Sequence, residues 1–129
     1  MFEKLEISRM AHALASHAMT RQGAIAQNVA NADTPGYRAV DTASFADSYS
    51  DQGSFAARAT RPGHFGATAL PVGFAVTPRP AAGSASPNGN SVSLEAEMMQ
   101  AAQVRQQYDM ALGIAKSVAG ILRTSLGRR

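Results

Sequence analysis

A turn signal at residues 28–37 separates a long helical pattern from a stretch that has no such pattern. The sequence there reads Asn-Val-Ala-Asn-Ala-Asp-Thr-Pro-Gly-Tyr. Pro35 has the fixed φ that suits the second position of a type II turn, and Gly36 supplies the positive φ that the third position requires. Asn31 and Asp33 have short polar side chains that bond to nearby backbone and help to end a helix. We therefore predict that a helix ends directly before a sharp turn.

The residues before this turn follow a helical period. Apolar residues recur at steps of three and four from Ile7 to Ala32, and part of the stripe has an eleven-residue repeat, typical of a straight or slightly right-handed helix. We predict a helix over residues 5–32, about 40 Å long at 1.5 Å per residue. Arg21 interrupts the stripe. The seam positions assigned to it are Leu14, Ile25 and Val29. This helix needs a partner, because an isolated helix with a narrow apolar stripe is marginal in water.

The C-terminal end carries a nearly strict heptad pattern over residues 93–126. Ser93 is the predicted N-cap, and Glu95 and Glu97 add negative charge to the first turn, where the helix dipole favours it. The predicted seam consists of Leu94, Met98, Ala101, Arg105, Tyr108, Leu112, Ala115, Ala119, Leu122 and Leu126. Three smaller residues, Val104, Ala111 and Val118, widen it on one side. We predict that this helix pairs with the first, while the alanine-rich stripes also allow helices of other subunits to pack.

Residues 38–92 lose the helical period, and five prolines between positions 62 and 87 prevent a long helix. Two weakly alternating runs, 40–45 and 72–76, are candidate short strands. Residues 81–89 have the composition of a flexible linker. An extended arm, a partly disordered insert and a loop ordered only by neighbouring subunits remain open for this segment.

The predicted fold class is therefore mainly α, with two long terminal helices and an extended or partly β middle. We divide the chain into residues 1–37, 38–92 and 93–129, with the first and last segments forming one helical domain. Much of the 45% hydrophobic content is alanine, and the aromatic residues are only 5 Phe and 3 Tyr, so a thick core is not expected.

Several function classes find no support in the sequence. The net charge of +3 is spread along the chain without a basic run, so a nucleic-acid stripe is not indicated. Cysteine is absent, and His12 and His17 lie five apart, which does not suit a helical metal site. Catalytic motifs, cofactor motifs, a cleavable signal and an apolar run of membrane-spanning length are also missing. We expect no enzyme, metal or cofactor; a small basic adaptor that binds nucleic acid or a partner helix remains an alternative.

The stretch from Asn28 to Tyr37, followed by the basic Arg38, resembles the N-terminal signature of the bacterial flagellar axial proteins. The run from Gly89 to Met98 resembles the second signature of that family. The resemblance is strongest to the rod proteins, and among them to proximal rod members, because the chain is short and its C-terminal helix lacks an asparagine that several relatives carry. A faint likeness to proximal rod proteins also falls on residues 60–65.

The resemblance implies a structural subunit of the proximal rod in the periplasmic part of the flagellar basal body. It implies unfolded type III export without signal cleavage, followed by helical assembly. The implied partners are copies of itself, other rod proteins, the rod-base adaptor, and export-gate or MS-ring components, with no nucleic acid and no direct membrane insertion; a different rod subunit is the alternative within the family. The implied assembly motif consists of Asn28, Asn31, Thr34, Pro35, Gly36, Tyr37, Glu95, Glu97 and Met98. The subunit-packing seam consists of Leu14, Ile25, Val29, Leu94, Arg105, Tyr108, Leu112 and Leu122.

Four polar positions have two interpretations from sequence. Arg21 and Arg105 either extend their stems along the apolar stripes to reach solvent or form an ion pair or hydrogen bond that fixes register with another subunit. Tyr37 and Tyr108 either pack ordinarily or bond their hydroxyl groups across an interface. Asp41, in the polar segment after the turn, is expected to be solvated.

Overall fold

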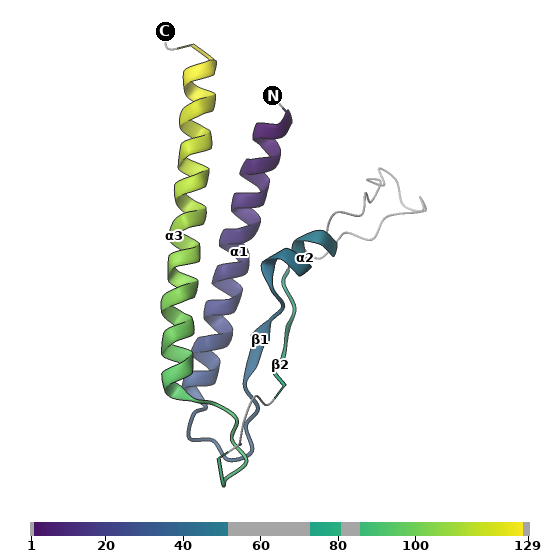
Figure 1. Ribbon diagram of the computed structural model, residues 1–129, viewed down its shortest axis with the longest axis vertical. Helices are drawn as coiled ribbons and strands as arrows, with labels where there is room; N and C mark the ends of the chain where they lie inside the picture. The colour runs from purple at the N-terminus through teal and green to yellow at the C-terminus, as the bar shows by residue number, and fades with distance from the viewer. Residues whose placement is uncertain (1, 52–72, 81–85, 128–129) are drawn as a thin grey trace, which may run out of the picture.

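The computed structural model describes residues 2–51, 73–80 and 86–127. Two long helices, α1 (Phe2–Ala30) and α3 (Leu94–Ser125), run antiparallel with both chain ends at the same end of the molecule (Figure 1). Strand β1 (Val40–Thr42) and strand β2 (Val76–Pro78) form a small antiparallel sheet, and a short helix α2 (Phe45–Asp51) follows β1. The predicted fold class is confirmed.

Helix α1 ends where the turn chemistry predicts. The Asn31 N–H bonds to carbonyl oxygens of the last helical turn, and the Tyr37 N–H bonds to Thr34 O at 3.3 Å. Gly36 has a φ of 70°, as the predicted turn requires. The helix begins at Phe2 and stops at Ala30, so the predicted range of 5–32 was displaced at both ends.

The helix pair has a thin core. Ala18, Ile25 and Val104 are almost fully buried together, and Ala101 and Tyr108 pack against them half-buried. Most other buried apolar residues are alanines, while the largest fully buried side chains include the polar His17, Asn28 and Glu97. Small residues let the helices approach closely, but each alanine removes little apolar area from water.

The contact between α1 and α3 is centred on a different row from the predicted seam. The buried residues of α3 are Glu97, Val104, Ala111 and Val118, which follow one another at steps of seven. One row of the predicted seam is half-buried beside this contact row, and it consists of Ala101, Tyr108, Ala115 and Leu122. The other row is exposed, and its members include Leu94, Met98, Leu112 and Leu126. The predicted seam therefore combined one row that faces α1 with a second that faces outward. Its leucines are larger than the valines and alanines of the true contact row, and the sequence pattern gives large side chains more weight.

The described parts of the middle segment are more ordered than their composition predicts. Strands β1 and β2 pair with Val40 opposite Pro78 and Thr42 opposite Val76, so the second strand lies later than the predicted 72–76. Part of the predicted flexible linker, residues 86–89, forms a turn in which the Gly89 N–H bonds to Ser86 O at 2.7 Å. The predicted features at residues 52–72, including the likeness at 60–65, lie outside the described residues.

Helix α2 was not predicted, although it had a local signal. Ser44 caps the helix: the Asp47 N–H donates to Ser44 Oγ at 3.2 Å, and the Ser44 hydroxyl donates to Asp47 Oδ2 at 2.6 Å. This is a capping arrangement at Ser-x-x-Asp spacing. Within the described parts of the chain, no helix is both long and apolar enough to cross a membrane.

Candidate functional site

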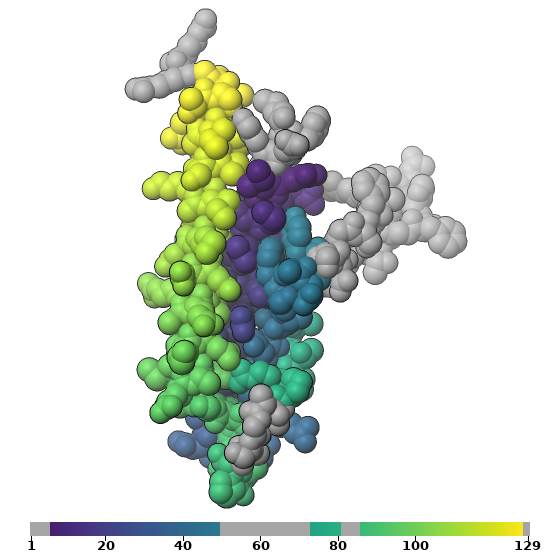
Figure 2. Space-filling view, in the orientation of Figure 1, coloured from purple at the N-terminus to yellow at the C-terminus, as the bar shows by residue number. Residues whose placement is uncertain are grey.

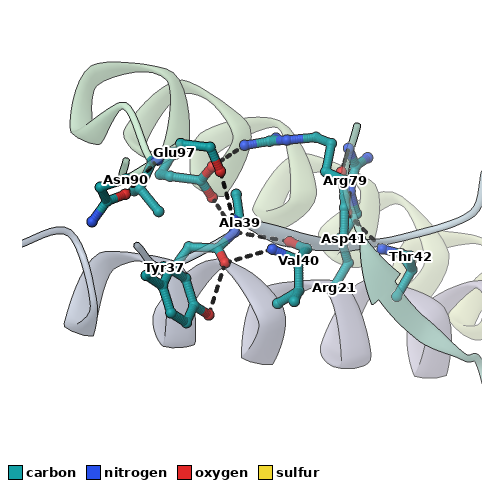
Figure 3. A network of polar contacts seen from close by, with 12 residues as sticks. Arg21, Tyr37, Ala39, Val40, Asp41, Thr42, Arg79, Asn90 and Glu97 are labelled. Carbon is teal, nitrogen blue, oxygen red and sulfur yellow. Dashed lines mark hydrogen bonds and ion pairs between the residues drawn. The ribbon is translucent and has the colours of Figure 1, made fainter. Parts of the chain in front are cut away.

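A buried polar junction joins the end of α1, the β-sheet and the start of α3. Asn28, in the last turn of α1, is fully buried and uses its whole side-chain amide. Figure 3 shows its partners Tyr37, Val40 and Glu97 close together at the junction. Its Nδ2 donates to Val40 O at 2.8 Å and to Glu97 Oε2 at 3.0 Å, while its Oδ1 accepts from the Val40 N–H at 2.9 Å and from the Tyr37 hydroxyl at 3.3 Å. A side chain with two donors and two acceptor sites is thereby satisfied completely.

Glu97 is the charged centre of this junction. Its carboxylate is 0% exposed and accepts from Arg79 Nη2 at 2.6 Å as well as from Asn28. A buried carboxylate is costly unless it is paired and hydrogen-bonded, and both conditions hold here. Arg79 directly follows β2, and its backbone N–H donates to Ala39 O at 2.8 Å. The ion pair therefore ties the sheet to the first turn of α3.

Asn90, in the second signature, binds the turn that follows α1 at the same end of the molecule. It is 2% exposed, and its Nδ2 lies 2.7–2.9 Å from the carbonyl oxygens of Asn31, Ala32 and Thr34. Its Oδ1 accepts from the Val92 N–H at 2.7 Å. One amide nitrogen from the second signature thus binds three carbonyl groups of the turn that follows α1.

The two signature turns also contact each other through their backbones. The Gly36 N–H donates to Asn88 O at 3.0 Å, and the Ser91 N–H donates to Tyr37 O at 3.1 Å. Gly89 has a φ of 78°, and a Cβ atom there would lie 3.5 Å from the Cα of Gly36. The distant N-terminal and C-terminal signatures thus form one continuous structural unit.

Comparison with known proteins shows to which protein family the chain belongs. Residues 15–38 match the family model described as flagella basal body rod protein. The chain is also 31% identical over 120 residues to the flagellar basal body rod protein FlgB of Agrobacterium fabrum (strain C58), with 89% of this chain and 88% of that protein covered. The chain belongs to the flagellar basal body rod protein family. This is a family of structural rod proteins, not of enzymes, and the chain is FlgB-like within it.

The junction explains part of the rod-protein signature in physical terms. Of the residues assigned to the assembly motif, Asn28, Tyr37 and Glu97 meet directly, Asn31 bonds back to Gln27 O through its Nδ2, and Thr34, Pro35 and Gly36 form the turn. Glu95 and Met98 are exposed on α3 and lie outside the junction. An assembly role for these positions stays a prediction, because their contacts described here are all within one chain.

The seam residues divide by exposure. Ile25 is buried, Leu14, Tyr108 and Leu122 are half-buried, and Val29, Leu94, Arg105 and Leu112 are exposed. Tyr108 packs against the thin core, and a bond of its hydroxyl group across an interface stays a prediction. Contacts of the exposed group with other subunits stay a prediction for the rod protein.

The prediction for Asp41 was wrong, and the ion pair considered for Arg21 forms inside the chain. Arg21 Nε donates to Asp41 Oδ1 at 2.9 Å, and its Nη2 donates to Asp41 Oδ2 at 3.1 Å. The side chains are 24% and 17% exposed. Strand β1 pairs with β2 while lying against α1, which brings the carboxylate over the arginine. Arg21 interrupts the apolar stripe because it faces this strand, whereas Arg105 is exposed on the other helix.

Sequence reasoning missed Arg79, Asn90 and His17. His17 is 2% exposed; its Nε2 lies 2.8 Å from Ala43 O, and its ring makes an edge contact with Phe74 at a centroid distance of 4.8 Å. Because a carbonyl oxygen only accepts, we place the hydrogen on Nε2. Asn90 had a signal in the second signature, but Arg79 and His17 stand in segments whose partners only the fold reveals.

The turn glycine permits a test with a matched control. Gly36→Ala is expected to destabilise the chain by about 1–2 kcal/mol, because alanine resists positive φ. No neighbouring atom lies within 4 Å of the added Cβ, so the cost is that of the backbone alone. Gly113→Ala makes the same chemical change inside α3 with the same open space, and should stabilise by roughly 0.5–1 kcal/mol. Urea denaturation of both variants checks this, and shifts of the same sign would contradict it.

Proposed function

We propose that this rod protein is a structural subunit of the proximal rod, exported unfolded by the flagellar type III apparatus without signal cleavage and assembled helically in the periplasmic space. Its partners are copies of itself, other rod proteins, the rod-base adaptor, and export-gate or MS-ring components. The observation that carries the proposal is the match to FlgB over most of both chains. The thin core supports the export step, because a marginally stable chain unfolds readily and is stabilised when partners bind its folded form.

Exposed apolar side chains support the assembly step. Met19, Met98 and Leu126 are 64%, 65% and 73% exposed, and Leu94 and Leu112 are about half exposed. Apolar patches of this kind mark protein–protein contacts in soluble proteins. Strands β1 and β2 lie over one side of α1 (Figure 2). Among the described helices and strands, α3 packs against α1 alone. Much of α3 is therefore available to neighbouring subunits.

Leu112→Asp separates assembly from folding. Because Leu112 is 47% exposed in the single chain, the substitution should change the free energy of unfolding of the purified protein by less than about 1 kcal/mol. Its incorporation into basal bodies should fall sharply, because an unpaired charge would be buried at a subunit contact. The measurement is immunodetection of tagged chains in purified basal bodies, together with motility. Ala46→Asp, on the exposed surface of α2, is the control and should incorporate normally. Absence of the tagged wild-type chain from basal bodies would refute the proposed function.

A further inference from the structure

The outer face of α3 carries a straight apolar line that has no role in the fold of the single chain. Met99, Met110 and Ile121 follow one another at intervals of eleven residues and are 67%, 53% and 50% exposed. An eleven-residue interval is close to three whole turns, so the three side chains lie almost in line along the axis. We call this line the methionine ridge.

Between Met99 and Ile121 the exposed side chains beside the ridge carry no charge, and exposed Glu95 lies one helical turn before its first member. The exposed neighbours between its members include Gln103, Gln106 and Ser117, while the charged residues of α3 after Glu97 occupy another side of the helix. These charged residues are Arg105, Asp109, Lys116 and Arg123. Depletion of charge and enrichment of methionine are typical of the buried centre of a protein interface. Neither feature is expected on a helix face that stays in contact with water.

A groove of about 600 Å³ lies between α1 and α3. Small apolar residues form its floor, namely Val104 and the alanines at positions 18, 101 and 102. Larger side chains complete its lining, and these are Met19, Gln22, Arg105, Tyr108 and Asp109. Small side chains leave the space open, and Met19 adds an exposed apolar contact. The groove suits one long, flexible apolar side chain from another helix, since side chains of one helix pack into grooves of its neighbours.

We propose that Met110, at the centre of the methionine ridge of one copy of this chain, seats in the α1/α3 groove of the next. The proposal rests on the proposed function and specifies the contact between copies. Arg105, at the groove, and Met110, on the ridge, are five residues apart, or roughly 140° around the helix axis. One α3 can therefore offer its ridge to one neighbour while its groove receives another. Such a heterologous contact does not pair the same surfaces, and its repetition builds a ring or an open helical array.

The absence of cysteine from the sequence permits a direct test. Met19→Cys and Met110→Cys chains are mixed, both as purified protein at high concentration and by co-expression in cells from which basal bodies are isolated. Mild oxidation should give a dimer that needs both cysteines, because a disulfide forms only where the two Cα atoms come within about 7 Å. A chain with both substitutions should give a ladder of dimers, trimers and longer species. Each single variant should remain monomeric.

Two controls make the outcome decisive. Met110→Cys mixed with Ala46→Cys, a cysteine on exposed α2, sets the background of random collision. The ridge-and-groove contact is overturned if basal bodies that contain both chains give no Met19–Met110 dimer above this background. Where the chains are absent from basal bodies, a purified mixture without that dimer overturns it. Dimerisation of Met110→Cys alone also overturns it, because it would indicate a symmetric contact. A chain present in basal bodies without the mixed dimer leaves the proposed function intact and removes the inference. If the purified proteins form the mixed dimer but no chain is found in basal bodies, the inference stands and the proposed function is refuted.

Discussion

Arg79→Met should destabilise the isolated chain by about 3–5 kcal/mol, the usual cost of removing one partner from a buried ion pair. Glu97 is fully buried, and without Arg79 its only remaining side-chain partner among the described residues is the Asn28 amide. The loss is comparable with much of the stability of a small domain, typically about 5–15 kcal/mol. Urea denaturation followed by circular dichroism measures it, with loss of helix in water as the extreme result.

The double variant Arg79→Met/Glu97→Gln tests whether charge is the reason. It should recover most of the lost stability, because glutamine keeps an oxygen for Asn28 and leaves no buried charge without a partner. Arg105→Met removes an arginine from the exposed side of α3 and should shift stability by no more than about 0.5 kcal/mol. If Arg79→Met behaves like Arg105→Met, the ion pair does not hold the sheet to α3.

Asn28→Asp is expected to cost at least about 3 kcal/mol, although aspartate has nearly the same shape. The new carboxylate would lie about where Nδ2 stands, 3.0 Å from Glu97 Oε2 and 2.8 Å from Val40 O, so two attractive contacts become repulsive. Thermal unfolding should show a much lower Tm for this variant.

The neighbouring substitution Gln27→Glu adds the same charge on the exposed side of the same helical turn. It should leave the Tm close to that of the wild type, because exposed charges interact weakly. An equal effect of both substitutions would show that Asn28 matters only as a site of net charge, and the junction geometry would lose its significance.

Local chemistry accounts for the parts of the fold that sequence reasoning reached. The positive φ of Gly36 follows from residues that are neighbours in the chain. Helix α3 begins directly after Ser93 as predicted, although the Ser93 side chain makes no capping hydrogen bond. The contact row of α3 is harder to predict from the sequence, because Leu112 and Val104 are both apolar residues at helical spacing. Only the position of α1 decides which of the two is buried. Periodicity predicts that a helix has an apolar face, but a wide face can serve two partners.

For a similar reason, the sequence predicts only some of the residues that form the junction. Asn28, Tyr37 and Glu97 stand in recognisable signatures, so they were candidates before the fold was known. Arg79 stands between two prolines in a segment without period, and its partner lies 18 residues away. Asp41 looked solvated because its partner Arg21 is on a different element. Ion pairs between different elements depend on how the sheet packs against α1, and no local sequence pattern shows which residues this packing brings together.

The bond between Asn28 and Glu97 spans 69 residues, and this separation orders the events of folding. A chain grows from its N-terminus, so the residues of α1 are synthesised long before those of its partner helix. Closing a long loop is entropically unfavourable until the contacts that reward it are made, and topologies dominated by distant contacts fold slowly. The nascent chain therefore passes through most of its synthesis with the amide of Asn28 and the apolar face of α1 without their partners from α3. Its final structure can form only when the last quarter of the sequence has been made.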